Sequence, residues 1–469
     1  MAGDSPADDD PWGFLPKRDA LVPEGGPVEK RERGELRGEM VGTSLKRRAW
    51  PIALCLALVS VAGFLTEVVA TSHLLSVAGP NSLAIVFPLG GAGLLLLGAL
   101  QFQFVDQKER LPLLRLVTSG YAVVYAIAFA LIVASVAESV ATGAVIMMGD
   151  QLNFLVPLLV WSLAGDEFNV AEGRKIFGWI VSWTYGGQIL GLLLSVATPS
   201  VLSSLDIDVI WILVLAPVAV LFVGLWLPVA LKDSAASTGL HREENALEAV
   251  KSAWDFIQGV PVWRAFVVSS VLTFVAGMTA FLAYLGGAER LLGDDPGSLQ
   301  VHLGGVMLVS FTLCLLLQKF GAEKLQDKIG IPGVLLILPI ATVVAGIAIA
   351  VGIAADSIWV ILFGISLWLV PRWSVDENGR RGALALVPDE RRTRVSFLVD
   401  LGPIAVGLLA AAPLMAVGEL TDQYWLVPIL AGVIAVVALP WSLRVRRDWE
   451  DSLLNWRLRR RKQNRIADF

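Results

Sequence analysis

Six polar side chains stand inside long apolar stretches of this sequence, where they could bind or exchange charge. An ionisable group inside a membrane-spanning helix costs about 2.5 kcal/mol or more, so it marks a candidate site. Amides and phenols at the same depth can orient a polar molecule through hydrogen bonds. We expect a solute or protons to bind at these six residues: Glu67, Asp150, Gln151, Asn153, Tyr185 and Gln188.

The two acids of this set also have structural alternatives. Asp150 could instead pack the helices through an interhelical hydrogen bond. Glu67 could face the outer end of its helix, and His73 lies closer still to that end, as an interfacial residue.

The other reactive residue types indicate no enzyme. The chain has three histidines, and His241 and His302 are isolated. It has no paired cysteine motif, and no glycine-rich phosphate loop followed by Gly-Lys-Ser/Thr. Cys55 and Cys314 lie in apolar stretches and predict no disulfide. We therefore expect no catalytic residue, no metal and no cofactor.

The apolar stretches predict an all-α integral membrane protein with twelve spans. The sequence is 55% hydrophobic and 17% charged, with a mean hydropathy of +0.68, whereas soluble domains carry about 25% charged residues. A stretch of about 20 residues crosses about 30 Å of hydrocarbon as a helix, and continuous apolar runs without alternation exclude a barrel. The predicted spans are 51–75, 82–104, 113–136, 140–163, 176–198, 209–231, 265–288, 301–320, 332–354, 357–371, 396–417 and 425–443.

The lysines and arginines test this arrangement. Of the 37 in the chain, all but Arg290 fall in segments that the twelve spans place on one side. Basic loops of membrane proteins are cytoplasmic, so we predict both termini in the cytoplasm of a bacterial plasma (inner) membrane protein. In this arrangement no basic residue lies near the middle of a span, and Arg372, Arg380 and Arg381 fall in the loop after the tenth span.

Six spans, an extended linker and six further spans are the layout of major facilitator folds. In the linker, Leu247, Val250, Trp254 and Ile257 recur at helical spacing, which predicts an amphipathic helix at the membrane surface. Aromatic and basic residues at the end of the chain favour contact with anionic lipid rather than nucleic acid. The predicted divisions are a disordered cytoplasmic tail (1–48), an N-terminal six-helix half (49–231), the linker (232–264), a C-terminal six-helix half (265–443) and a basic cytoplasmic tail (444–469).

Two short loops occupy equivalent positions in the two halves and carry charges. Asp106 and Arg110 follow the second span, and Asp327 and Lys328 follow the eighth. Such residues can hold a closed state through charge pairs and helix ends. A solvated turn is the structural alternative for each loop.

Three stretches of the sequence resemble a known family. They are AGDEFNVAEGRKIFG at 164–178, the segments LGG at 303–305 and LLLQ at 315–318, and VPDERRTRVSFLVD at 387–400. Together they look like the ATP/ADP translocases of plastids and intracellular bacteria, and more closely like free-living bacterial relatives in the major facilitator superfamily. The resemblance extends over roughly residues 50–440 and implies exchange of nucleotides or transport of a related solute.

The resemblance adds candidate residues for gating. Arg174 lies in the first stretch, and Arg394 fits a basic position of the third. Ser396 stands where the family commonly has a lysine. We expect Asp400 in the first turn of the eleventh span, where it completes a helix N-terminus or pairs with Arg391, Arg392 or Arg394, with gating as a further option.

These observations predict a secondary active transporter that works by alternating access on a small solute, with proton coupling as an option. An ATP/ADP-type nucleotide exchanger is one alternative, although a phosphate site ordinarily supplies Arg or Lys. A membrane sensor or assembly module that transports nothing is the other. We expect a monomer whose partners are the solute and the lipid bilayer.

Overall fold

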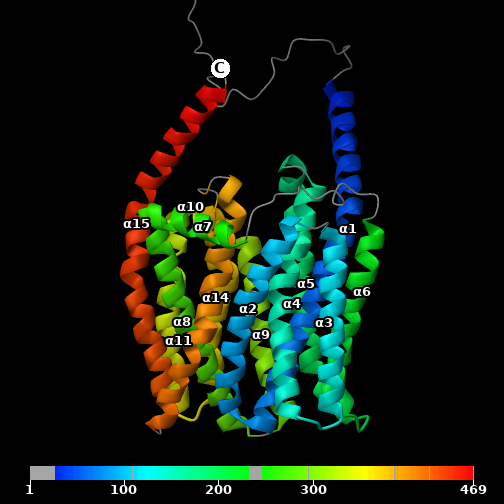
Figure 1. Ribbon diagram of the computed structural model, residues 1–469, viewed down its shortest axis with the longest axis vertical. Coiled ribbons are helices and arrows are strands. Elements are labelled where there is room, and N and C mark those ends of the chain that lie inside the picture. The colour runs from blue at the N-terminus through cyan, green and yellow to red at the C-terminus, as the bar shows by residue number, and fades with distance from the viewer. Residues whose placement is uncertain are drawn as a thin grey trace, which may run out of the picture. The chain divides into compact units, whose positions relative to one another are not determined.

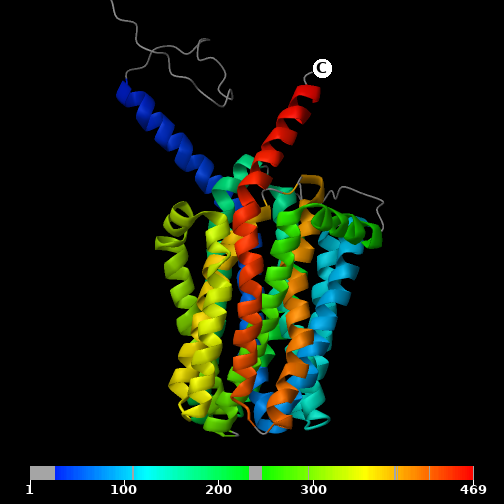
Figure 2. The ribbon, with the colours of Figure 1, turned by 90° about the vertical axis from the view of Figure 1, so that its left-hand side faces the viewer.

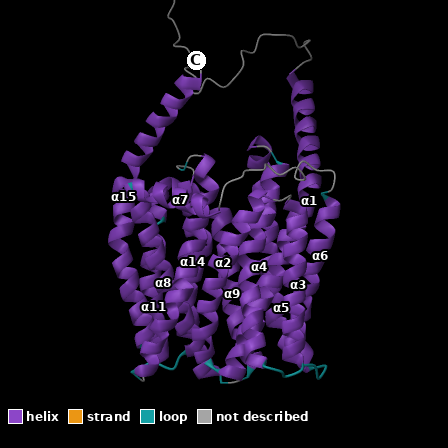
Figure 3. Cartoon of the chain, in the orientation of Figure 1, coloured by secondary structure: helices purple, strands orange, loops and turns teal. Residues whose placement is uncertain are grey.

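The computed structural model describes residues 27–107, 110–168, 170–231, 246–293, 295–384, 387, 389–421 and 423–467. These residues form helices and loops and contain no strand (Figure 3). The chain divides into two units, Met1–Arg48 and Ala49–Phe469, and only the second is considered below. Of the predicted tail over 1–48, residues 1–26 lie outside the described part, and a helix begins at Pro27.

Twelve helical segments of the described chain are long and apolar enough to cross a membrane, which confirms the twelve predicted spans. The first six belong to α1 (Pro27–Ala78), α2 (Leu83–Gln107), α3 (Arg110–Val133), α4 (Glu138–Glu167), α5 (Val170–Ser203) and α6 (Leu215–Ala230). The others belong to α8 (Pro261–Leu292), α9 (Pro296–Phe320), α11 (Ile337–Ala354), α12 (Ile358–Pro371) with its continuation, α14 (Asp389–Leu420) and α15 (Leu426–Ala467).

The two ends of the helix bundle differ. At one end lie the short helices α7 (Ala246–Gly259) and α10 (Ala322–Val334), and we call it the linker end (Figure 1). At the opposite end short loops join α1 to α2, α3 to α4, α8 to α9 and α11 to α12, and we call it the hairpin end (Figure 2).

Helices of the two halves pack side by side. α2 packs against α14, and α5 packs against α9, so two helix pairs join the halves. Within the N-terminal half, α5 crosses α1 closely, since an added Cβ on Gly187 would lie 2.2 Å from the backbone oxygen of Ala57. Small residues allow such approaches between membrane helices.

The tenth span is longer than predicted. It extends over Ile358–Leu384 rather than 357–371, because α12 continues through a π-helix (Arg372–Asp376) into α13 (Glu377–Leu384). The prediction ended the span at the first charges, but in the structure these charges are paired and buried. Arg372 lies fourteen residues from the start of α12, which corresponds to about 21 Å from the hairpin end. The prediction that no basic residue lies deep in a span is therefore wrong.

Candidate functional site

Two carboxylates and an amide of the N-terminal half lie together near the middle of the bundle. Asn153 Nδ2 donates a hydrogen bond of 3.1 Å to Glu67 Oε2, and Asp150 lies one turn before Asn153 on α4. Glu67 is eleven residues from the end of α1, and Asp150 is twelve from the start of α4. Both therefore lie about 17 Å from the hairpin end. We call these three residues the acid cluster.

The acid cluster is not neutralised by a cation within the described chain. Glu67, Asp150 and Asn153 each keep part of their surface accessible, although they lie deep in the bundle. Within the described chain neither carboxylate pairs with a lysine, arginine or histidine. Gly90 of α2 leaves room for this group, since a Cβ there would come within 2.6 Å of Asp150 Oδ2.

The remaining predicted residues lie elsewhere. Gln151 and Gln188 are buried, and the Oε1 atom of each has no hydrogen-bond partner among the described residues. Tyr185 lies at a contact between the halves: its hydroxyl donates to the carbonyl oxygen of Trp373 at 3.3 Å. Gln318 Nε2 donates to the same carbonyl at 3.2 Å and also to the Tyr185 hydroxyl. We call Tyr185, Gln318 and Trp373 the interface triad.

Aromatic rings extend the interface triad toward the acid cluster. Phe64 of α1, one turn before Glu67, meets Phe311 of α9 edge to face, with ring centroids 4.7 Å apart. Its centroid lies 6.3 Å from that of Trp373. These contacts join the two halves on the linker side of the acid cluster.

The C-terminal half contains a buried group of charges that the sequence analysis placed in a loop. Its members, which we call the ion-pair network, are Arg372, Asp376, Glu377, Arg380, Arg381 and Asp400. Arg380 contacts all three carboxylates, with Asp376 at 3.0 Å, Glu377 at 3.2 Å and Asp400 at 3.9 Å. Arg372 contacts Glu377 at 3.1 Å, and its guanidinium lies 4.7 Å from the ring centroid of Phe274.

Every cation of the ion-pair network is thus opposed by a carboxylate. The side chains of Arg372 and Arg380 are only 4% and 2% exposed, whereas that of Arg381 is 57% exposed. A buried charge is tolerated when it is paired and hydrogen-bonded. Three carboxylates balance three guanidinium groups, so the network holds no surplus positive charge for an anionic ligand.

The predicted position of Asp400 at a helix N-terminus is wrong, whereas its role in gating stays a prediction. It lies eleven residues after the start of α14, not in a first turn. Its contacts are Ser396, whose hydroxyl donates to Asp400 Oδ2 at 2.8 Å, and Arg380 on α13. Sequence reasoning chose neighbours along the chain, but the helix turns Asp400 toward another element.

The loop residues proposed for gating are only partly described. The side chains of Asp106 and Arg174 lie outside the described part of the structure. Arg110 Nη1 donates to the carbonyl oxygen of Ser162 at 2.8 Å, which ties α3 to α4. Asp327 and Lys328 are exposed, and Arg394 is half-buried.

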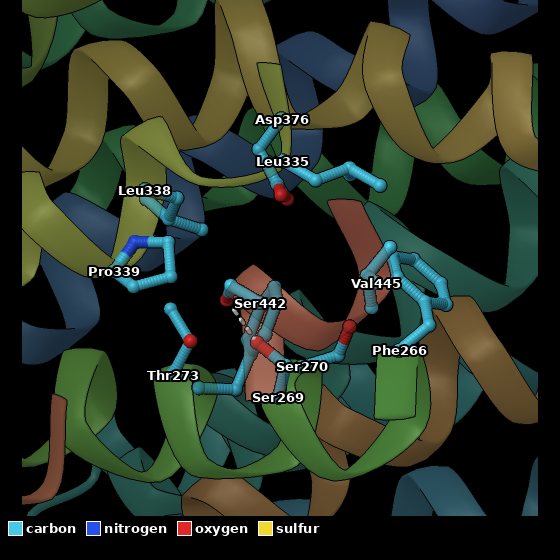
Figure 4. Close-up of a pocket in the computed structure, with 11 residues that line it drawn as sticks. Phe266, Ser269, Ser270, Thr273, Leu335, Leu338, Pro339, Asp376, Ser442 and Val445 are labelled. Carbon is cyan, nitrogen blue, oxygen red and sulfur yellow. Dashed lines mark hydrogen bonds between the residues drawn. The ribbon is translucent and has the colours of Figure 1, made fainter. Parts of the chain in front are cut away.

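A small pocket lined by both apolar and polar side chains lies beside the ion-pair network, between α8, α15 and the junction of α10 with α11 (Figure 4). The carboxylate of Asp376 points into it, and the hydroxyls of Ser269 and Ser442 hydrogen-bond to each other on its wall. The Thr273 hydroxyl in this wall has no hydrogen-bond partner among the described residues. Because all its walls belong to the C-terminal half, the pocket is separate from the surface between the halves.

Sequence reasoning missed several of these contacts, although signals were present. Arg372, Asp376 and Arg380 follow one another at a spacing of four, which pairs opposite charges along one helix face. That spacing, after a predicted span too short to cross the membrane, indicates a continuing helix. His73 Nε2 lies 2.9 Å from Glu138 Oε1, so His73 connects α1 to the start of α4.

No protein-family model and no curated protein sequence matches this chain. Solved structures do. The nucleoside transporter NupG is 15% identical, with a TM-score of 0.62 over 84% of this chain and 98% of that one. A bacterial homologue of the iron transporter ferroportin, in an inward-facing state, is 15% identical, with a TM-score of 0.61 over 86% and 98%. A bacterial homologue of the human lysosomal transporter Spinster is 14% identical, with a TM-score of 0.59 over 86% and 98%.

These likenesses show the fold. The chain is an all-α, multi-pass integral membrane protein with the fold of the major facilitator transporters, as its layout of two six-helix halves predicted. The narrower resemblance to the ATP/ADP translocases stays a prediction.

Proposed function

We propose that this protein is a secondary transporter that moves a small solute by alternating access between its two halves. The observation that carries the proposal is the acid cluster: Glu67 and Asp150 lie near mid-membrane with no cationic partner in the described chain. Uncompensated carboxylates at that depth are costly and mark a functional site. The fold supports the same proposal, since major facilitator proteins place their substrate near the midplane between the halves.

In this proposal the acid cluster couples its own protonation to the conformational change of the transporter. An ionised Glu67 accepts the hydrogen bond of Asn153, and a proton on Glu67 or Asp150 removes one of two neighbouring negative charges. A ligand shifts a conformational equilibrium only by its differential affinity for the two states. Protonation therefore drives transport if the two states solvate these carboxylates differently.

The predicted topology and divisions belong to the same proposal. The linker end and both termini lie in the cytoplasm of a bacterium in this proposal, which the basic residues near that end support. The proposal keeps the predicted divisions, with the tenth span extended to Leu384, the twelfth span extended to Ser452 and a helix that begins at Pro27. The protein acts as a monomer, with anionic lipid at its basic tails and Arg110, Arg174, Asp327, Lys328 and Arg394 in its gates.

Replacement of one carboxylate tests proton coupling. Asp150→Asn keeps the side-chain shape and removes the charge. When proteoliposomes are incubated with a metabolite pool, we expect their solute uptake driven by a pH gradient to fall at least tenfold. Asp356→Asn is the matched control, because Asp356 is exposed in the loop between α11 and α12. Unchanged proton-driven uptake by Asp150→Asn would show that this carboxylate does not couple transport.

Nucleotide exchange is the second candidate, supported by the three stretches similar to ATP/ADP translocases. Counterflow of labelled ATP in the same proteoliposomes decides it: exchange at millimolar ATP would establish this candidate over proton-coupled transport. If no metabolite is transported and none raises the melting temperature, a sensing or assembly role replaces both.

A further inference from the structure

The two halves of the protein differ in whether their buried charges have partners of opposite charge. In the ion-pair network each buried arginine already contacts two or more carboxylates. In the acid cluster Glu67 accepts a hydrogen bond from Asn153, and within the described chain no cation faces Glu67 or Asp150. A charged substrate between the halves would therefore meet unopposed negative charge and no free positive charge. This balance favours a cation and disfavours phosphates or carboxylates.

The C-terminal half supplies aromatic rings at a similar depth. Phe281 and Tyr284 of α8 lie with their ring centroids 5.6 Å apart, and the centroid of Trp368 on α12 is 6.3 Å from that of Phe281. Counting residues from the hairpin ends of α8 and α12 places all three about 12–17 Å from that end. Phe281 also reaches across the halves to Phe87 of α2, at 6.2 Å between centroids.

Tyr284 connects these rings to the acid cluster. It is 1% exposed and lies within electrostatic range of Glu67. Its hydroxyl has no hydrogen-bond partner among the described residues, and neither has Nε1 of Trp368. Buried Tyr and Trp side chains usually find a partner for their polar atoms. The Tyr284 hydroxyl is thus an unpartnered donor within electrostatic range of an unopposed carboxylate, as expected of a binding site.

We infer that the solute proposed above is an organic ammonium cation, held between the carboxylates of Glu67 and Asp150 and the aromatic rings of Phe281, Tyr284 and Trp368. Charge attracts the cation to the N-terminal half, and the negative faces of the rings receive its alkyl ammonium group from the C-terminal half. A divalent metal ion prefers a cage of several oxygen ligands, and the described residues contain no group of three or more His, Cys, Asp or Glu side chains that could hold one. The inference rests on the proposed transport function.

The test uses probes that differ only in charge. Benzyltrimethylammonium and its neutral isostere neopentylbenzene have the same shape, as do choline and 3,3-dimethylbutan-1-ol. We expect each ammonium probe to raise the melting temperature of the purified full-length protein in detergent and its neutral partner to leave it unchanged, because a bound ligand stabilises the folded state. ATP and inorganic phosphate serve as anionic probes and should give no shift.

Variants locate the binding. Glu67→Gln should weaken the affinity for benzyltrimethylammonium at least tenfold. Trp368→Leu should weaken it about three- to tenfold, whereas Trp368→Phe, which keeps a ring, should lose less. Asp356→Asn should bind like the unmodified protein.

Each other outcome contradicts the inference. Equal binding of the neutral isosteres would indicate apolar recognition, a shift with ATP or phosphate alone would indicate an anion site, and no shift with any ammonium probe would exclude the cation. Failure here remains distinguishable from failure of the transport proposal. If ammonium probes bind but are not taken up, transport fails and the site stands; if Asp150→Asn abolishes proton-driven uptake of a neutral or anionic solute, transport stands and the cation fails.

Discussion

At the scale of single residues, Arg380 is the centre of the C-terminal half. Its side chain is 2% exposed and contacts Asp376, Glu377 and Asp400, which belong to three consecutive helical elements. A buried ion pair adds little net stability, but removing one partner leaves an uncompensated charge. The network should therefore be most sensitive to loss of this one cation.

We expect Arg380→Met to destabilise the protein by about 3–5 kcal/mol, since the buried Asp376 and the partly buried Glu377 and Asp400 lose their shared partner. Arg381→Met is the matched control: its side chain is 57% exposed, and its bond to Glu377 should be worth about 1 kcal/mol or less. Melting temperatures in one detergent compare the two. Adding Asp376→Asn to Arg380→Met should recover part of the loss, and equal melting temperatures for the two single variants would contradict a structural role of the network.

At the scale of elements, the path of the tenth span and the crossing of α1 with α5 decide which side chains meet. The π-helix at Arg372–Asp376 lets α12 continue past its apolar part into the charged α13. π-Helical segments often occur at functional sites. Here the segment places Trp373 in the interface triad and Arg372 and Asp376 in the ion-pair network.

The crossing of α1 with α5 gives a prediction with a control one residue away. Gly187→Ala would bring Cβ to 2.2 Å from the Ala57 oxygen, so α5 must move away from α1, and we expect a lower melting temperature. Gly186→Ala meets nothing within 4 Å and should be neutral or slightly stabilising, since alanine favours helix by up to about 1 kcal/mol. The reverse order of the two melting temperatures would contradict the close crossing.

At the scale of the whole helix bundle, hydrogen bonds between the halves occur on both sides of the acid cluster. Toward the linker end the Tyr185 hydroxyl bonds to Gln318 and to the carbonyl oxygen of Trp373. Toward the hairpin end Gln300 Nε2 donates to the carbonyl oxygen of Ser195 at 2.6 Å. We call these two sets of hydrogen bonds the closures. Alternating access requires that they break in turn, so the closure at one end stabilises the state that is open at the other end.

Removing the linker-end hydrogen bonds and removing the hairpin-end hydrogen bond should therefore shift the conformational population in opposite directions. We expect Gln318→Ala to lengthen the distance between spin labels at Arg115 and Lys324, two exposed positions near the linker end, as measured by double electron–electron resonance. Gln300→Ala should shorten that distance or leave it unchanged. Labels at Val136 and Asp356, exposed near the hairpin end, should respond with the opposite sign. A shift of the same sign in both variants would contradict alternating closure.

The sequence by itself determined the class of the protein and much of its architecture. Span length and hydropathy are local properties, so the twelve helices and the layout of two halves follow from residue composition. Glu67 and Asp150 were also recognisable, because a charge within an apolar stretch is conspicuous without any knowledge of its neighbours.

The tertiary structure decided which side chains contact one another. Glu67 meets Asn153 from a position 86 residues away, and Tyr185 meets Gln318 from one 133 residues away, distances that no local pattern encodes. The end of the tenth span was mispredicted for the same reason. The cost of burying Arg372 and Arg380 depends on the carboxylates that face them, and one of these, Asp400, belongs to the next long helix. Hydropathy counts each charge alone, whereas the folded chain buries Arg372 and Arg380 together with the carboxylates that compensate them.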